Sequence, residues 1–118
     1  MSIDLKRAYD APAKSDGCRI LIDRIWPRGI AKDDLQVDAW LKDLAPSAGL
    51  RKWFGHDPKK WDEFKKRYAR ELEQRSDALE QLVERARAGR VTLVFGAKDT
   101  EHNNAVALKE HLDLRRTR

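Results

Sequence analysis

Apolar alternation and short aliphatic runs predict three strands, two near the start of the chain and one near its end. Residues 3–9 alternate Ile3 and Leu5 with polar positions, as in a half-buried strand. Residues 19–25 and 91–95 are rich in aliphatic and β-branched side chains and are bounded by glycine or proline. We therefore expect a strand at each of these three places.

The middle of the chain predicts helices. Apolar positions fall on one side of a first helix that Pro46 ends: Leu35, Ala39, Trp40 and Leu44. Residues 50–55 have the pattern of a single helical turn closed by Gly55. Asp57 and Pro58 are a capping residue and a proline at a first helical position, so a longer helix begins there. Its inward face is largely aromatic: Trp61, Phe64, Tyr68 and Leu72.

Two more helices complete the expected order of elements. Ser76 or Asp77 can cap a helix that Gly89 ends, with the apolar stripe Leu79, Leu82, Val83 and Ala86. In the last helix Asn104 shares the inward face with Glu101, Ala105, Leu108 and Leu112, whereas Asn103 points nearly opposite. Strands separated by helices predict an α/β fold with a small, at least partly parallel sheet flanked by helices.

Length and composition indicate one compact globular domain over residues 1–118. Hydrophobic residues make up 41% and charged residues 38% of 118, with four Trp. No apolar run approaches a membrane span, and residues 1–6 include the charged Asp4 and Lys6 where a signal peptide would need an apolar stretch. The single cysteine, Cys18, excludes an internal disulfide. We therefore expect a cytoplasmic protein without a membrane partner.

The positive charge is concentrated at the C-terminus. Three of the five net positive charges belong to Arg115, Arg116 and Arg118 in a basic tail over residues 113–118. A short tail of this kind is more often solvated than functional. The overall charge is thus weak support for nucleic-acid binding.

The second and third predicted strands run straight into polar loops. Ligands bind at the carboxyl ends of strands in open α/β sheets, so two such loops on adjacent strands would form a site. The candidate ligand-binding residues are Asp23, Arg24, Arg28, Lys98, Asn103 and Asn104. A guanidinium can hold a phosphate or carboxylate through two parallel hydrogen bonds, and Arg28 between Pro27 and Gly29 is the arginine displayed best.

Structural roles for the same residues remain open. Asp23 can pair with an arginine to hold its turn while Trp26 fills the core. Asp99 can act as a helix N-cap, which is the common use of an aspartate before a helix. Asn104 beside the strand end is either a tie for the loop or a ligand contact, because a buried amide needs partners.

Catalytic chemistry has only two candidates near these loops. Asp99 and His102 are the acid or base candidates, although no orienting partner for His102 is evident in the sequence. His56 lies between Gly55 and Asp57, so we expect it to form a turn rather than to act in catalysis. Cys18 has no activating base nearby in the sequence. No glycine-rich phosphate loop and no close metal-ligand spacing occur, so the sequence predicts neither a metal nor a cofactor.

Three sequence blocks carry a family resemblance. They are DGCRILIDRIWPRG, LKDLAPSAGLRKWFGHDPKKWDEFKKRY and VTLVFGAKDTEHNNAVALKEHL. These blocks resemble the signature blocks of the YeaO-like proteins, the domain-of-unknown-function family 488, and with the spacing between them they span residues 3–112. The resemblance implies a compact bacterial α/β protein and no settled activity. The basic tail lies outside it.

Two functions follow from these patterns. The first is binding, or binding with turnover, of a small anionic or nucleotide-like metabolite at the strand ends. The second is a non-enzymatic nucleic-acid or protein-binding module that uses a basic helix face made by Lys59, Lys60, Lys65, Lys66, Arg67 and Arg70. Acidic residues interrupt this face and the aromatic residues belong to the buried side, which favours the first function. The sequence leaves the substrate, the reaction, the strand order and the oligomeric state open.

Overall fold

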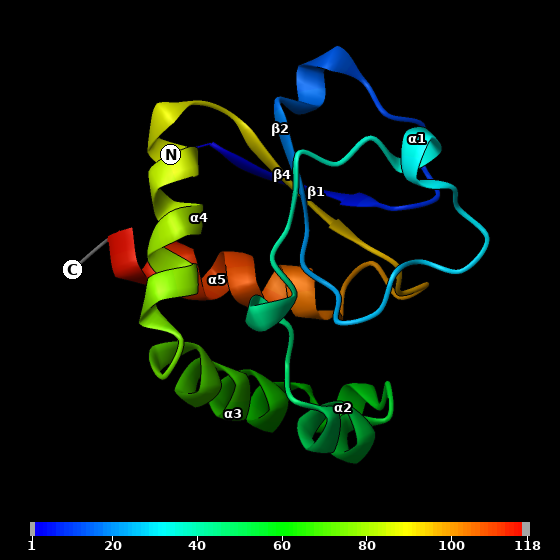
Figure 1. Cartoon of the computed structure of the whole chain (residues 1–118). Coiled ribbons are helices and arrows are strands. Elements are labelled where there is room, and N and C mark those ends of the chain that lie inside the picture. Colours follow the sequence, from blue (N-terminus) through cyan, green and yellow to red (C-terminus); the bar gives the residue numbers. More distant parts are fainter. Residues whose placement is uncertain (1, 117–118) are drawn as a thin grey trace.

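Strand β4 (Val91–Phe95) lies inside a four-stranded sheet. The structure is a computed structural model that describes the backbone of residues 2–116 and the side chains of residues 2–114. β1 (Ile3–Arg7) pairs with one edge of β4 and β2 (Cys18–Leu21) with the other. β3 (Ala39–Trp40) pairs with the outer edge of β2, so the order is β1-β4-β2-β3 (Figure 1). All three pairings are parallel, which confirms the predicted α/β fold with a parallel sheet.

Four helices form a core with one face of this sheet: α2 (Ala48–Phe54), α3 (Trp61–Glu73), α4 (Ser76–Ala88) and α5 (Asn104–Arg116). The short helix α1 (Lys32–Leu35) packs on the other face. Buried residues of α2 to α5 form one core with the inward side chains of β1, β2 and β4. In Figure 1, α2 and α3 lie next to each other beyond the carboxyl ends of the strands.

The opposite face of the sheet is closed by a smaller cluster. Leu21 and Val94 meet Leu35 of α1 there, and Trp26 and Trp40 pack against them. Every residue of β4 is consequently buried. This explains why the run at 91–95 is apolar at four positions rather than alternating, and its one polar residue, Thr92, donates its hydroxyl to Asp16 O at 2.7 Å.

The predicted helix through residues 35–44 is wrong. Gln36 ends α1 with a left-handed φ of 52°, and the chain then becomes extended as β3. Backbone bonds from Asp38 N to Arg19 O and from Leu41 N to Leu21 O join this segment to β2. Helical apolar spacing was outweighed by strand pairing that only the tertiary fold provides.

The other predicted elements occur with shifted ends. The first two strands end at Arg7 and Leu21, short of the predicted Tyr9 and Ile25. Asp57 caps the start of the α3 region as predicted, because its carboxylate accepts a hydrogen bond from Lys59 N. Ser76 and Asp77 lie inside α4, which begins without a side-chain cap.

The amphipathic faces are confirmed. Phe64, Tyr68 and Leu72 of α3 are buried, and Trp61 is half-buried at the edge of the same core. The apolar stripe of α4 is buried as predicted, and Gly89 follows its last turn. The side chains of Arg115, Arg116 and Arg118, on which the basic-tail prediction rests, lie outside the described residues.

Candidate functional site

Asp23 lies where β2 ends, directly beside the end of β4. The two strands are parallel and in register, so their carboxyl ends meet at the same edge of the sheet. Gly96 N donates to Asp23 Oδ2 at 2.8 Å, and Asn104 Nδ2 donates to Asp23 Oδ1 at 3.0 Å. Asn104 also donates to Ile22 O at 3.3 Å. The predicted inward orientation of Asn104 is therefore observed, and its amide ties the start of α5 to the end of β2.

The electrostatics of Asp23 are set by its half-buried position. Burial raises the pKa of this carboxyl. Hydrogen bonds from Asn104 and Gly96 and the positive charge of Arg51 act in the opposite direction and only partly offset burial. Asp23 has no salt bridge within the described part of the chain, so the alternative in which it pairs with a neighbouring arginine is not observed.

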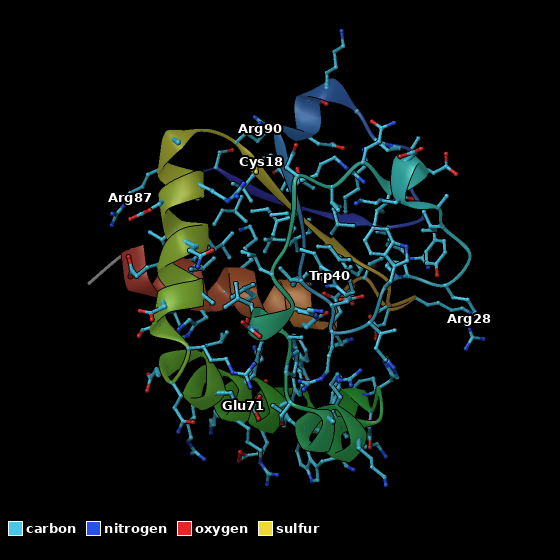
Figure 2. All side chains as sticks on the ribbon, viewed as in Figure 1. Cys18, Arg28, Trp40, Glu71, Arg87 and Arg90 are labelled. Carbon is cyan, nitrogen blue, oxygen red and sulfur yellow. The ribbon has the colours of Figure 1, made fainter. Side chains whose placement is uncertain are left out.

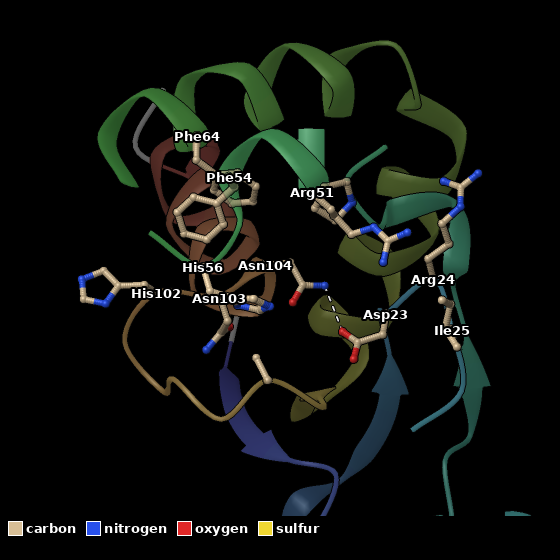
Figure 3. A pocket seen from close by; sticks show the side chains of 12 residues that line it. Asp23, Arg24, Ile25, Arg51, Phe54, His56, Phe64, His102, Asn103 and Asn104 are labelled. Carbon is tan, nitrogen blue, oxygen red and sulfur yellow. Dashed lines mark hydrogen bonds between the residues drawn. The ribbon is translucent and has the colours of Figure 1, made fainter. Parts of the chain in front are cut away.

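A cavity of about 300 Å³ opens above Asp23 and Asn104 (Figure 3). The strand-end loops, α2, α3 and the start of α5 all contribute to its lining, which comprises Asp23, Arg24, Ile25, Pro46, Arg51, Phe54, His56, Phe64, Ala97, His102, Asn103 and Asn104. Phe54 and Phe64 stack with ring centroids 4.4 Å apart and form an apolar wall. The cavity therefore combines an apolar wall with a few polar groups, as small-molecule sites do.

Two guanidinium groups at this cavity are unpaired. Arg24 and Arg51 are both exposed and both line the cavity. Within the described residues neither side chain has a hydrogen bond or an ion pair. Their donors are consequently available to an anion, and the lining holds two guanidinium groups against one carboxyl group.

Asp99 supplies the orienting partner that the sequence did not reveal for His102. Asp99 Oδ2 lies 3.0 Å from His102 Nδ1. Asp99 Oδ1 accepts hydrogen bonds from the backbone N of Glu101 and of His102. The bond from Glu101 N, followed by those from His102, lowers the pKa of Asp99. Trp61 meets the His102 ring edge-on at 5.3 Å.

The alternative in which Asp99 caps the last helix is not observed for α5, because Asn103 has that position. Asn103 is 3% exposed, and its Oδ1 accepts a hydrogen bond from Val106 N. Its amide donates to Asp99 O at 2.9 Å. Asn103 therefore precedes α5 and does not point outward as the helical projection suggested.

The predicted site residues do not all meet. The cavity receives Asp23, Arg24, His102, Asn103 and Asn104. Its lining does not include Arg28, Lys98 or Asp99. Figure 2 shows Arg28 extended at the edge of the molecule, where Tyr9 Oη donates to its backbone carbonyl at 3.0 Å.

Sequence reasoning missed the lining residues from α2. Arg51 and Phe54 lie one turn apart on this short helix, and Ser47 caps it by accepting from Leu50 N. Their local sequence resembles an ordinary surface helix, so nothing in it indicates a ligand. Only the docking of α2 beside α3 brings Arg51 opposite Asp23 (Figure 3).

Part of the basic face of α3 is engaged within the protein. Lys65 lies 3.0 Å from Glu110, and Arg67 lies 3.5 Å from Glu63. The Arg67 guanidinium also stacks 4.0 Å above Trp53. These cations cover aromatic rings that an exposed stacking platform for bases would need to present.

Neither Cys18 nor a metal-binding group forms a second functional site among the described residues. Cys18 is half-buried and accepts a contact from Arg85 Nη1 at 3.4 Å. The described residues contain no group of three or more His, Cys, Asp or Glu side chains that could hold a metal ion. None of the helices described is long and apolar enough to cross a membrane.

Fold and site together define a single α/β domain with a cavity at the strand ends that combines an apolar wall with a few polar groups. The chain belongs to the family described as the inactive DUF488-N3 subclade, whose family model matches residues 2–118. It is 42% identical over 112 residues to the uncharacterized protein YeaO of Escherichia coli, covering 95% of this chain and 97% of that protein. The uncharacterized proteins Rv3073c of Mycobacterium tuberculosis and Mb3100c of Mycobacterium bovis are each 41% identical over 111 residues, covering 94% of this chain and 93% of theirs. No solved structure matches the chain.

Proposed function

We propose that this chain binds a small anionic metabolite in the strand-end cavity, without turning it over. The observation that carries this proposal is that Arg24 and Arg51, at the mouth of a cavity with an apolar wall, have no hydrogen-bond or ion-pair partner among the described residues. Free guanidinium donors bind phosphate or carboxylate in a bidentate manner. The half-buried Asp23 and the Asn104 amide supply further polar contacts below them.

Binding without turnover is favoured by two considerations. The family description reads "inactive" for this subclade. Asp99, the acid or base candidate, does not line the cavity and its carboxylate is engaged by two backbone amides and His102. His102 remains as a polar contact at the cavity edge.

The alternative of a nucleic-acid surface on α3 has less support. Lys65 and Arg67 each have an acidic partner, and Trp53 and Trp61 are each covered by a cation. An extended basic face with exposed aromatic rings would be expected for single-strand binding.

A thermal-shift screen of phosphorylated and carboxylated metabolites tests the proposal. We expect at least one anion to raise the unfolding midpoint of the wild-type protein, because a ligand that binds only the folded state stabilises it. Arg51→Ala and Arg24→Ala should each reduce this shift. Arg87→Ala, which removes an exposed arginine of α4 far from the cavity, is the charge-matched control and should retain it.

Arg28→Ala separates the cavity from the loop chosen on sequence grounds. Because Arg28 does not line the cavity, we expect this variant to bind as the wild type does. Loss of binding in Arg28→Ala with retention in Arg51→Ala would contradict the proposed site. Chromatography of the metabolite after incubation with the protein measures turnover. Detection of a converted product would contradict binding without turnover.

A further inference from the structure

The two ends of the strand-end cavity have different chemistry. Its inner end carries the Asp23 carboxylate and the apolar wall of Phe54 and Phe64. Its mouth carries the exposed guanidinium groups of Arg24 and Arg51. A ligand that fills it therefore needs hydrogen-bond donors and apolar surface at one end and an anionic group at the other.

The inner end calls for hydrogen-bond donors from the ligand. Each oxygen of Asp23 accepts one hydrogen bond within the protein, from Asn104 at one oxygen and from Gly96 at the other. An ionised carboxylate has roughly four acceptor positions, so about half of this capacity is unused. Since no described cation forms a salt bridge with Asp23, hydroxyl or N–H groups of a ligand can use the remaining lone pairs.

Charge balance distinguishes between kinds of anion. The two guanidinium groups at the mouth together carry two positive charges. A phosphate dianion matches both of them, whereas the carboxylate of an amino acid supplies a single negative charge. Hydroxyl or ring N–H groups on the same ligand can donate to the unused lone pairs of Asp23.

The volume of the cavity and the exposure of its mouth also fit a small ligand with a phosphate group. A cavity of about 300 Å³ is at the small end of ligand pockets, which span roughly 300 to 1,000 Å³, and accommodates one small ligand. A phosphate at the exposed mouth keeps part of its hydration and avoids the cost of burying a charge. The apolar wall favours a flat, uncharged ring system.

We infer that the ligand is a nucleoside monophosphate, bound with its sugar and base toward Asp23 and Phe54 and with its phosphate at Arg24 and Arg51. This inference rests on the proposed function and names its ligand class. It assigns Asp23 to recognition of sugar or base donors, and the two arginines to the phosphate.

Calorimetric titration of the wild-type protein with a graded ligand series tests the inference directly. The probes are the 5′-monophosphates of adenosine, guanosine, cytidine and uridine, the corresponding nucleosides, ribose 5-phosphate, inorganic phosphate and leucine. We expect at least one nucleoside monophosphate to bind at least tenfold more tightly than its nucleoside, ribose 5-phosphate, inorganic phosphate or leucine. This comparison needs no variant.

Variants then separate the two ends of the cavity. Asp23→Asn should weaken the preferred nucleotide at least tenfold while leaving the weak binding of inorganic phosphate unchanged. Arg51→Ala should weaken both, and Phe54→Leu should weaken the nucleotide but not phosphate. Circular dichroism of each variant shows that the fold is retained, and Arg87→Ala is the control.

The failure of this inference differs from the failure of the proposed function. If ribose 5-phosphate, inorganic phosphate or leucine binds as tightly as every nucleotide and Arg51→Ala abolishes that binding, the ligand class is overturned and the site stands. If Asp23→Asn is folded and binds the nucleotide unchanged, the assigned role of Asp23 is overturned. If no probe binds the wild-type protein and the metabolite screen is also negative, both are overturned.

Discussion

Asn104 donates its side-chain amide to the carboxylate of Asp23, 81 residues earlier in the chain, at 3.0 Å. This bond joins the start of α5 to the end of β2, where the cavity begins. It makes one rigid unit of the strand ends that supply the floor of the cavity.

Removal of this tie should destabilise the domain. Asn104→Ala leaves Asp23 Oδ1 and Ile22 O without this donor, and an unpaired buried acceptor costs about 1–3 kcal/mol. Urea unfolding followed by circular dichroism measures the change. Glu101→Ala, at an exposed side chain in the same loop, is the control and should change stability by less than about 0.5 kcal/mol. Equal stability of both variants would show that the amide is not a structural tie.

Asp23 should give the protein a specific pH dependence. Its pKa is raised in the folded state above the unfolded value near 3.8, so the folded state binds the proton more tightly. The stability that Asp23 contributes is therefore complete below the unfolded pKa and is lost as the pH rises through the folded pKa. The unfolding free energies of wild type and Asp23→Asn are compared between about pH 3 and pH 7. The free energy of wild type relative to that of the variant should decrease as the pH increases. A difference that is constant with pH would refute this.

Asp16 should show the opposite pH dependence. Burial by itself raises the pKa of Asp16, but hydrogen bonds from Ala13 N, Lys6 and Arg19 outweigh it and the pKa is lowered. Asp16 Oδ2 lies 2.7 Å from the Arg19 guanidinium, and both residues are buried. Asp16→Asn leaves this guanidinium without its carboxylate and should cost about 3–5 kcal/mol near neutral pH. The cost should shrink as the pH falls through the folded pKa, which unfolding at two pH values measures, with exposed Asp33→Asn as the control.

The aromatic residues of α3 should differ in their contribution to stability. Phe64 is 2% exposed and stacks on Phe54, so Phe64→Ala should cost about 3–5 kcal/mol. Trp61 is only half-buried, and Trp61→Ala should cost less. Denaturant unfolding followed by circular dichroism makes the comparison, because Trp61 itself contributes fluorescence. A larger loss for Trp61 would mean that its contacts to Phe64 and His102 matter more than burial.

The basic face of α3 should not behave as a nucleic-acid site. Lys65 is paired with Glu110, so Lys65→Ala with Lys66→Ala should leave binding of single- and double-stranded oligonucleotides weak and unchanged. Fluorescence anisotropy at two salt concentrations measures this. Tight binding that falls steeply with salt and is lost in the double variant would favour the alternative function, since counterion release produces that dependence.

The sequence by itself determined the local parts of this protein. Asp57 with Pro58 begins the α3 region, Gly55 ends α2 with a φ of 54°, and the run at Val91–Phe95 forms a strand. The inward position of Asn104 also follows from helical spacing alone. Each of these depends on backbone chemistry or periodicity within a few residues, which the sequence contains directly.

Tertiary structure alone decided which residues share the site. Arg51 reaches the cavity because α2 packs beside α3, and Arg28 stays outside it although it lies in the same loop as Asp23. The segment around Trp40 became a strand because β2 offered an unpaired edge, against its helical spacing. The physical reason is common to these cases: side-chain spacing encodes which face is apolar, whereas the partner of that face is set by packing between segments far apart in the chain.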